Sequence, residues 1–202
     1  MTADDTYTTI SAPSTAEIKE KASRFIAEAF PVSSPDQAEA RILEVRKREY
    51  NATHVCSAWR VGPTGDPFRF NDDGEPGGSA GMPILRHIEG RSLTNVLVTV
   101  TRYYGGTKLG TGGLVRAYGD AASLALDAAP TQVVVLRDDV KITFAYDDTS
   151  PAMHVIGLFD AVMGDATYDE RTHLTVAVRR SETARFRAAL IDALSGRVVI
   201  EA

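Results

Sequence analysis

Two glycine-rich segments, one on each side of a strongly apolar stretch, constrain this chain more than any other feature. Residues 74–81 read GEPGGSAG and residues 105–113 read GGTKLGTGG. Because glycine and proline in such density oppose both helix and strand, we predict that both segments are loops of defined shape. Residues 94–103, between them, carry apolar side chains on both faces of an extended chain. This pattern is typical of a central strand that helices cover.

The residues around the two loops predict a mixed α/β domain. Ser34 is placed to cap a helix, with Pro35 at its first position and Gln37 completing a capping box, and this helix continues to about residue 50. The other expected elements are strands at 7–10, 18–32, 53–61 and 67–71, a short helix capped by Ser79 that ends at Gly90, and a helix after the second loop with Leu114, Tyr118, Ala121 and Ala125 on its buried side.

The pattern changes after Pro130, where we place a domain boundary. Apolar periodicity predicts a strand at 133–146, a helix at 150–163, strands at 165–170 and 172–179, a helix at 181–194 capped by Ser181, and a strand at 197–201. The order βαββαβ is the ferredoxin-like arrangement. The sequence therefore predicts an α/β (α+β) protein of two domains, residues 1–130 and 131–202.

Composition excludes several classes of protein. The chain has one cysteine, Cys56, so neither an intrachain disulfide nor a cysteine-based zinc site can form. No apolar run approaches the ~18 residues that span a bilayer. Residues 1–20 are polar and lack the apolar core of a secretory signal. We therefore expect a cytoplasmic protein.

The distribution of charge points to the glycine-rich part of the chain. The formal net charge is −5, which argues against a generally basic nucleic-acid-binding protein. Residues 74–116, however, hold five basic and two acidic side chains, and this basic segment is where an anion is expected to bind. Residues 133–202 hold eight basic and eleven acidic side chains, so charge gives no support to RNA binding by the second domain.

The first candidate site is the segment from Arg102 to Arg116. A buried strand runs here into a glycine-rich loop and then a helix, whose free N-terminal amides favour an anion. Arg102, Lys108 and Arg116 add positive charge, but the segment contains neither a Walker A loop nor a dinucleotide-binding fingerprint. A tight crossover packed against a neighbouring loop is the alternative interpretation. The glycines that would open the backbone to a ligand are Gly105, Gly106, Gly110, Gly112 and Gly113.

The second candidate site is the segment from Asn71 to Gly81, which contains the first loop and carries three carboxylates within four positions, Asp72, Asp73 and Glu75. Mg²⁺ or Ca²⁺ is conceivable there, although the spacing is not that of an EF-hand. Aspartate and glutamate beside glycine are also ordinary turn and cap residues. A third interpretation is a partner-binding loop in which Glu75 pairs with Lys108 or Arg102. We predict neither a metal nor a cofactor.

Histidine and tyrosine side chains near the two loops allow further roles. His54 lies on a predicted strand, where a general base would need a partner and a cleft. Cys56 falls on the same face of that strand and is expected to be a core residue. Tyr103 and Tyr104 can stack on bases, but at a buried strand end such residues more often pack or form structural hydrogen bonds.

Four segments resemble the YigZ/IMPACT family: Lys21–Ile26, Ala52–His54, Asp73–Leu85 and Val100–Gly110. The resemblance covers residues 17–125, and the remaining tail is similar to the second domain of the bacterial YigZ branch. It implies that the first domain shares the fold of a domain of a small-subunit ribosomal protein. It also implies that the second domain is ferredoxin-like, similar to a C-terminal domain of elongation factor G. Eukaryotic members act in translational control by binding a large ribosome-associated regulator, without catalysis.

We therefore expect a cytoplasmic, non-catalytic protein tied to translation, in which the two loops meet in one patch. Arg102, Lys108 and Arg116 would supply charge there. Glu75 and His54 would orient the patch toward an RNA phosphate or a ribosome-associated partner. The alternative is a hydrolase or transferase that acts on a phosphorylated small molecule at this patch, which needs a pocket with a base. A protein–protein adaptor would instead expose an apolar surface beside the loops.

Overall fold

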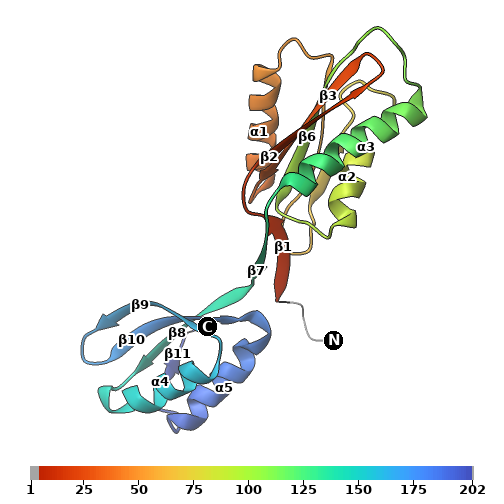
Figure 1. Cartoon of the computed structure of the whole chain (residues 1–202). Coiled ribbons are helices and arrows are strands. Elements are labelled where there is room, and N and C mark those ends of the chain that lie inside the picture. Colours follow the sequence, from red (N-terminus) through yellow and green to blue (C-terminus); the bar gives the residue numbers. More distant parts are fainter. Residues whose placement is uncertain (1–4, 202) are drawn as a thin grey trace. The chain divides into compact units, whose positions relative to one another are not determined.

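Residues 5–201, which the computed structural model describes, form two compact units (Figure 1). The first domain comprises residues 7–134, and the second comprises residues 135–201 together with residues 5 and 6. Both contain helices and strands, so the prediction of a mixed α/β protein with two domains is confirmed. No helix within residues 5–201 is long and apolar enough to cross a membrane.

The first domain is built on a five-stranded antiparallel sheet with the strand order β2-β3-β6-β4-β5. Its strands are β2 (Ser14–Glu20), β3 (Ser23–Pro31), β4 (His54–Arg60), β5 (Phe68–Asn71) and β6 (Val96–Tyr103). The strand predicted to be central is β6, which lies in the middle of the sheet with its first seven residues buried.

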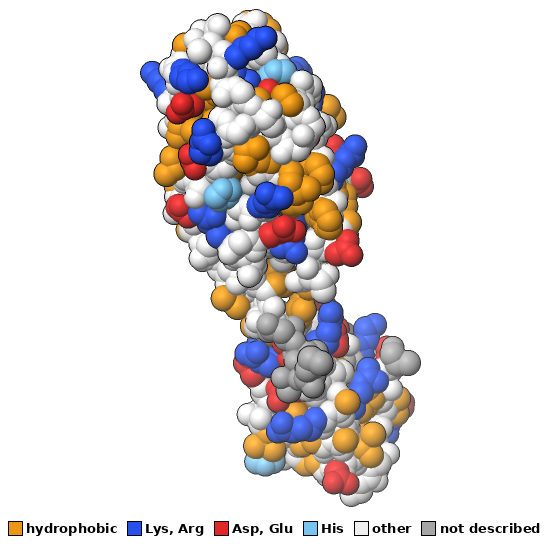
Figure 2. Space-filling view, turned by 90° about the vertical axis from the view of Figure 1, so that its right-hand side faces the viewer, with side chains coloured by type: hydrophobic (Ala, Val, Ile, Leu, Met, Phe, Trp, Pro, Cys, Tyr) orange, Lys and Arg blue, Asp and Glu red, His pale blue; other side chains and the backbone are white. Residues whose placement is uncertain are grey.

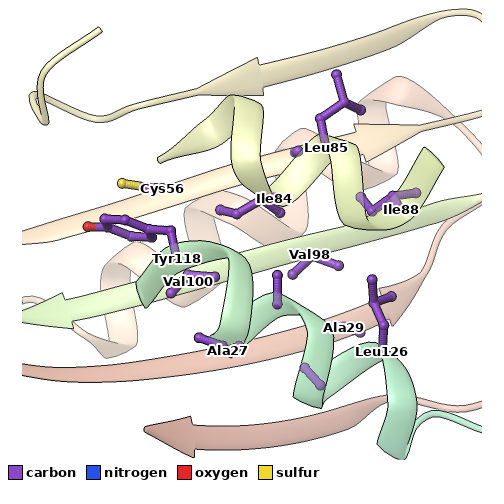
Figure 3. Packing of buried hydrophobic residues seen from close by; sticks show 14 of the residues in the cluster. Ala27, Ala29, Cys56, Ile84, Leu85, Ile88, Val98, Val100, Tyr118 and Leu126 are labelled. Atoms are coloured by element: carbon purple, nitrogen blue, oxygen red, sulfur yellow. The ribbon is translucent and has the colours of Figure 1, made fainter. Parts of the chain in front are cut away.

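Helices cover both faces of this sheet, as the apolar character of β6 requires (Figure 1). On one face, α1 (Pro35–Arg48) packs its Ile42 against Trp59 and Leu97 of the strands. On the other face, α2 (Gly81–Gly90) and α3 (Thr111–Ala128) enclose the larger cluster of buried side chains (Figure 3). The sheet face under α2 and α3 leads directly to the candidate site.

Two predicted elements of this domain are corrected by the structure. The single strand expected at 18–32 is the hairpin of β2 and β3, in which Lys21 has a φ of 53° at the turn. No glycine or proline marks that turn in the sequence. The cap expected from Ser79 is also wrong, because its hydroxyl donates to the Pro76 carbonyl. The carboxylate of Asp72 instead accepts from the amides that begin α2.

A two-stranded sheet pairs β1 (Thr6–Ile10) with β7 (Thr131–Val135). The strand expected at 133–146 is therefore divided into β7 and β8 (Arg137–Phe144). At Leu136, between them, the amide donates to the carbonyl of Asp5 at 2.6 Å. This bond belongs to neither sheet, so the apolar run of the sequence does not form one continuous strand.

The second domain has a four-stranded antiparallel sheet with the order β11-β8-β10-β9 and two helices on one face (Figure 1). Besides β8, its elements are η1 (Tyr146–Asp148), α4 (Thr149–Leu158), β9 (Val162–Tyr168), β10 (Thr172–Arg179), η2 (Arg180–Glu182), α5 (Thr183–Ala193) and β11 (Val199–Ile200). The predicted order βαββαβ is confirmed. Alternate residues of β8 and β10 pack against α4 and α5 in one buried cluster.

The boundaries predicted for the second domain are corrected at two places. The helix expected at 150–163 ends at Leu158, because Phe159 adopts an extended conformation and packs edge-on against Phe186 with ring centroids 5.2 Å apart. Ser181 does not cap the last helix, because its hydroxyl and its amide donate to the carboxylate of Asp5.

Candidate functional site

The site begins as one row of residues across the sheet of the first domain. Arg102, near the end of β6, lies opposite Phe25 of β3 on one side and His54 of β4 on the other. Paired residues of neighbouring strands point to the same face. The row therefore continues the buried face under α2 and α3, at the point where both glycine-rich loops leave the sheet.

A buried ion pair occupies the centre of this row. Nη1 of Arg102 donates to Oε1 of Glu75 at 2.6 Å, and both side chains are at least 94% buried. The hydroxyl of Tyr118 donates to the same oxygen at 2.7 Å, and Nη2 of Arg102 donates to the Ser23 hydroxyl at 3.3 Å. The guanidinium also lies 5.4 Å from the ring centroid of Phe25. These contacts fix the first loop to the strand end.

His54 presents one ring nitrogen to this pair. Its Nδ1 lies 2.7 Å from the carbonyl oxygen of Asp73, and because a carbonyl only accepts, Nδ1 carries the proton. In the neutral ring Nε2 is therefore an acceptor. It lies 3.9 Å from Oε1 of Glu75, with the His54 side chain 21% exposed.

Two glycines of the second loop answer different structural needs. A Cβ on Gly105 would lie 1.8 Å from the carbonyl oxygen of Ala22, so this glycine permits close packing against the β2–β3 turn. Gly110 has a φ of 71° and directly precedes α3, and a Cβ at this position would lie more than 4 Å from every non-neighbouring residue that the structure describes. Gly105 thus supports the interpretation of the segment as a tight crossover. Gly110 instead leaves free space beside the first residue of α3.

Residues from both loops enclose a cavity of about 490 Å³, which we call the loop pocket. Glu75 and Pro76 come from the first loop. The second loop and the start of α3 supply another part of the lining. The full lining consists of Thr53, His54, Glu75, Pro76, Arg102, Tyr104, Lys108, Leu109, Gly110, Thr111 and Leu114.

The loop pocket brings together half of the residues proposed from the sequence. The residues that line it are His54, Glu75, Arg102, Lys108 and Gly110. The residues that lie outside its lining are Arg116, Gly105, Gly106, Gly112 and Gly113. The structure thus places the two loops side by side, but the first two glycines of the second loop and the residues from Gly112 to Arg116 proposed for the site lie outside the pocket lining.

The three basic residues differ in how much charge they can offer. Glu75 neutralises Arg102, which therefore holds the pocket together instead of presenting a free cation. Lys108 and Arg116 are exposed and make no ion pair within residues 5–201. On the face drawn in Figure 2, basic and acidic side chains are interspersed, without one broad basic field among the described residues. Positive charge at the pocket is therefore local and centred on Lys108.

The carboxylates of the first loop are engaged by the protein itself. Asp72 accepts from the amides of Gly78, Ala80 and Gly81 at 2.8–2.9 Å. Asp73 pairs with Arg46 at 2.6 Å and accepts from the backbone amide of Val55 on β4. Within residues 5–201, no group of three or more histidine, cysteine or acidic side chains is placed to hold a metal ion.

Cys56 and Tyr118 lie in the core beneath the site (Figure 3). Burial raises the pKa of the Cys56 thiol, which donates to the carbonyl of Asp72 at 3.1 Å. Burial likewise raises the pKa of Tyr118, whose ring packs edge-on against Phe25. Both groups therefore stay protonated at neutral pH, and Cys56 offers no thiolate nucleophile.

Sequence reasoning missed three residues of this site. Tyr118 was expected only as a core residue of its helix, and nothing local marks its hydroxyl bond to Glu75. Thr53 lines the pocket and accepts from the amide of Tyr104 at 3.0 Å. Thr111, the first residue of α3, also lines the pocket. Its position directly after Gly110 is the signal that could have identified it.

Known proteins share both halves of this architecture. Residues 21–126 match the family described as the Impact N-terminal domain, and this range includes strands β3 to β6, both loops and most of α3. The chain belongs to the IMPACT family. Residues 142–197 match a domain of unknown function (DUF1949).

Individual relatives of the IMPACT family differ in how much of the chain they match. The IMPACT family member YigZ of Escherichia coli K12 is 34% identical over 183 residues, covering 90% of each chain. The IMPACT family member YvyE of Bacillus subtilis 168 is 43% identical over 121 residues, covering 60% of this chain and 56% of that protein. A solved structure titled "Crystal structure of an hypothetical protein" has 32% identity and a TM-score of 0.71, covering 98% of both chains.

Proposed function

We propose that the chain binds RNA phosphate groups through the loop pocket and acts in the regulation of translation. One observation carries this proposal: Lys108, which has no ion-pair partner in the described part of the chain, lines the loop pocket together with the start of α3. The proposal draws on the family for the setting in translation and on the pocket for the ligand chemistry.

The start of α3 has the properties of an anion site. Its cap residue is Gly110, which makes no side-chain capping bond, and its first turn contains no acidic residue. The amides of the first turn therefore keep their hydrogen-bonding capacity and the positive end of the helix dipole. Together with the ammonium of Lys108, they offer donors and charge suited to a phosphate.

The exposed residues of the loop pocket leave room for a polymer. Of its lining residues, Tyr104, Lys108, Gly110 and Thr111 are exposed, as are their chain neighbours 105–107 and 112. A nucleic acid can therefore place one phosphate in the pocket while its chain continues across the rim. Such contacts fix position without reading base sequence.

Co-sedimentation with ribosomal particles over a salt series tests this proposal. We expect the wild-type chain to pellet at low salt and to dissociate as salt rises. Lys108→Ala should weaken binding and reduce the slope of log affinity against log salt by about one, because one phosphate contact is lost. Thr111→Asp should abolish binding through a competing carboxylate. An aspartate in the first turn of a helix stabilises it by about 0.3–1 kcal/mol, so this variant should stay folded.

The matched control is Lys47→Ala, which removes an exposed lysine on α1, outside the loop pocket. This variant should pellet like the wild type. The proposal is overturned if Lys108→Ala keeps the wild-type affinity and salt slope, or if the wild-type chain never pellets at low salt.

His54 supports a second candidate, hydrolysis or transfer at a phosphoester. In the neutral ring its Nε2 is an acceptor, and His54 lines the pocket, which is the position a general base requires. The same incubation separates the two functions. RNA cleavage by the wild type that is lost in His54→Gln would indicate catalysis, whereas RNA that stays intact with the wild type supports binding alone.

A further inference from the structure

We propose that the loop pocket is a nucleotide site, in which Tyr104 stacks on the base while Lys108 and the start of α3 hold the phosphate. This inference rests on the proposed function, because it assigns the phosphate to the same groups. It adds the base, and with it a ligand class: a nucleoside 5′-monophosphate, free or at an RNA terminus or splayed position.

The two adjacent tyrosines have different surroundings, and only Tyr104 faces the loop pocket. The hydroxyl of Tyr103 donates to Glu49 at 2.6 Å, and Arg24 lies over its ring at 4.9 Å, so this side chain has a structural role. Tyr104 lines the loop pocket with 43% of its surface exposed. An aromatic ring that lines a pocket and retains so much exposed surface is available for stacking.

Tyr104 is held in place from behind. The guanidinium of Arg102 lies 5.3 Å from its ring centroid, and this guanidinium is itself fixed by Glu75 and Ser23. The backbone amide of Tyr104 donates to the hydroxyl of Thr53 at 3.0 Å. A base that stacks here therefore loses little affinity to ordering of the protein.

The rest of the lining matches the remaining parts of a nucleotide. Pro76, Leu109 and Leu114 give apolar contact. Nε2 of His54 offers an acceptor for a ribose hydroxyl or an exocyclic amine. The volume of about 490 Å³ lies within the range of small-molecule sites, about 300–1,000 Å³. An acidic peptide would use Lys108 but would leave the stacking surface of Tyr104 without a partner.

Calorimetric titration of the full chain tests the inference with three probes: inorganic phosphate, ribose 5-phosphate and adenosine 5′-monophosphate. All three should bind, and the nucleotide should bind about tenfold or more tighter than the sugar phosphate, because the base adds a stacking contact. Tyr104→Ala should reduce the nucleotide affinity to that of ribose 5-phosphate and leave the sugar phosphate unchanged. Tyr104→Phe should restore the nucleotide affinity. Lys108→Ala should weaken all three.

The control variant is Tyr50→Ala, which removes a tyrosine that is 79% exposed and lies outside the pocket lining. Equal affinities for the nucleotide and the sugar phosphate would overturn the inference and leave the proposed function intact. Binding of a glutamate-rich peptide but of no phosphate probe would overturn both. Ribosome binding without binding of any of the three small probes would overturn the nucleotide site alone.

Discussion

Arg102 and Glu75 show how a single residue pair determines the shape of the loop pocket. Both side chains are almost fully buried, and the carboxylate oxygen that accepts from Arg102 also accepts from Tyr118. Desolvation of two charges roughly offsets their mutual attraction, so such a pair adds little net stability. Removing one partner is different, because the other charge then stays buried without compensation.

Glu75→Gln tests this reasoning. The substitution keeps the shape of the side chain but leaves the cation of Arg102 uncompensated, and we expect a loss of about 3–5 kcal/mol in the free energy of unfolding. Urea unfolding followed by fluorescence measures it, because the one tryptophan of the chain, Trp59, lies in the first domain.

Glu44→Gln is the matched control for Glu75→Gln, because it removes an exposed carboxylate paired with Arg41. The control should change stability by less than about 1 kcal/mol. The double variant Arg102→Met/Glu75→Leu should recover much of the lost stability. If Glu75→Gln unfolds at the same urea concentration as Glu44→Gln, the pair does not have the assigned role.

At the scale of elements, α2 begins under the control of a residue outside the helix. Asp72 accepts from the amides of Gly78, Ala80 and Gly81, and these bonds connect the first loop to the first turn of α2. A side-chain acceptor at a helix start contributes up to about 2 kcal/mol. The same carboxylate therefore stabilises the helix and the loop that supplies Glu75.

We predict that Asp72→Ala destabilises the first domain by about 2 kcal/mol or more, because three amides lose their acceptor. Ser79→Ala should cost less, about 0.5–1.5 kcal/mol, because it removes one bond to the Pro76 carbonyl. Equilibrium urea unfolding of both variants checks this order. A larger loss for Ser79→Ala would return the capping role to the serine.

The same contrast explains which elements sequence reasoning could predict. The start of α1 was predictable because its capping groups are neighbours: the Ser34 hydroxyl accepts from the amide of Gln37 at 3.2 Å. The caps at α2 and α5 were assigned wrongly because the actual bonds are less local. Asp72 reaches amides up to nine residues away, and Ser181 is bound by Asp5, 176 residues away. A hairpin turn without glycine or proline, at Lys21, gave no local signal either.

The candidate site was predictable in its loops and less so in its contacts. Glycine density identified both loops, because backbone conformation and close approach leave a mark on composition. The sequence offered Lys108 and Arg102 as partners for Glu75, and the choice of Arg102 depends on how the first loop packs against the end of β6, which is a long-range property. For this reason the sequence could not distinguish a free arginine from a paired one.

At the scale of the whole molecule, the chain contains separate hydrophobic cores. The clusters around β6 lie in the first domain, and the cluster between the second sheet and its two helices shares no residue with them. Each core is therefore built by its own segment of the chain, apart from the N-terminal residues 5 and 6 that belong to the second domain. Domains with their own cores can unfold as separate cooperative units.

We predict two thermal transitions, and a pair of matched core truncations assigns them. Ile88 and Leu190 are both fully buried, one in each domain. Replacing either with alanine removes about 2–5 kcal/mol from the domain that contains it, which lowers that transition by about 10 °C or more. Calorimetry detects both transitions, whereas Trp59 fluorescence should follow the first domain alone. Ile88→Ala should therefore shift the fluorescence midpoint and Leu190→Ala should leave it unchanged. A single transition that both substitutions lower equally would show instead that the two cores unfold as one cooperative unit.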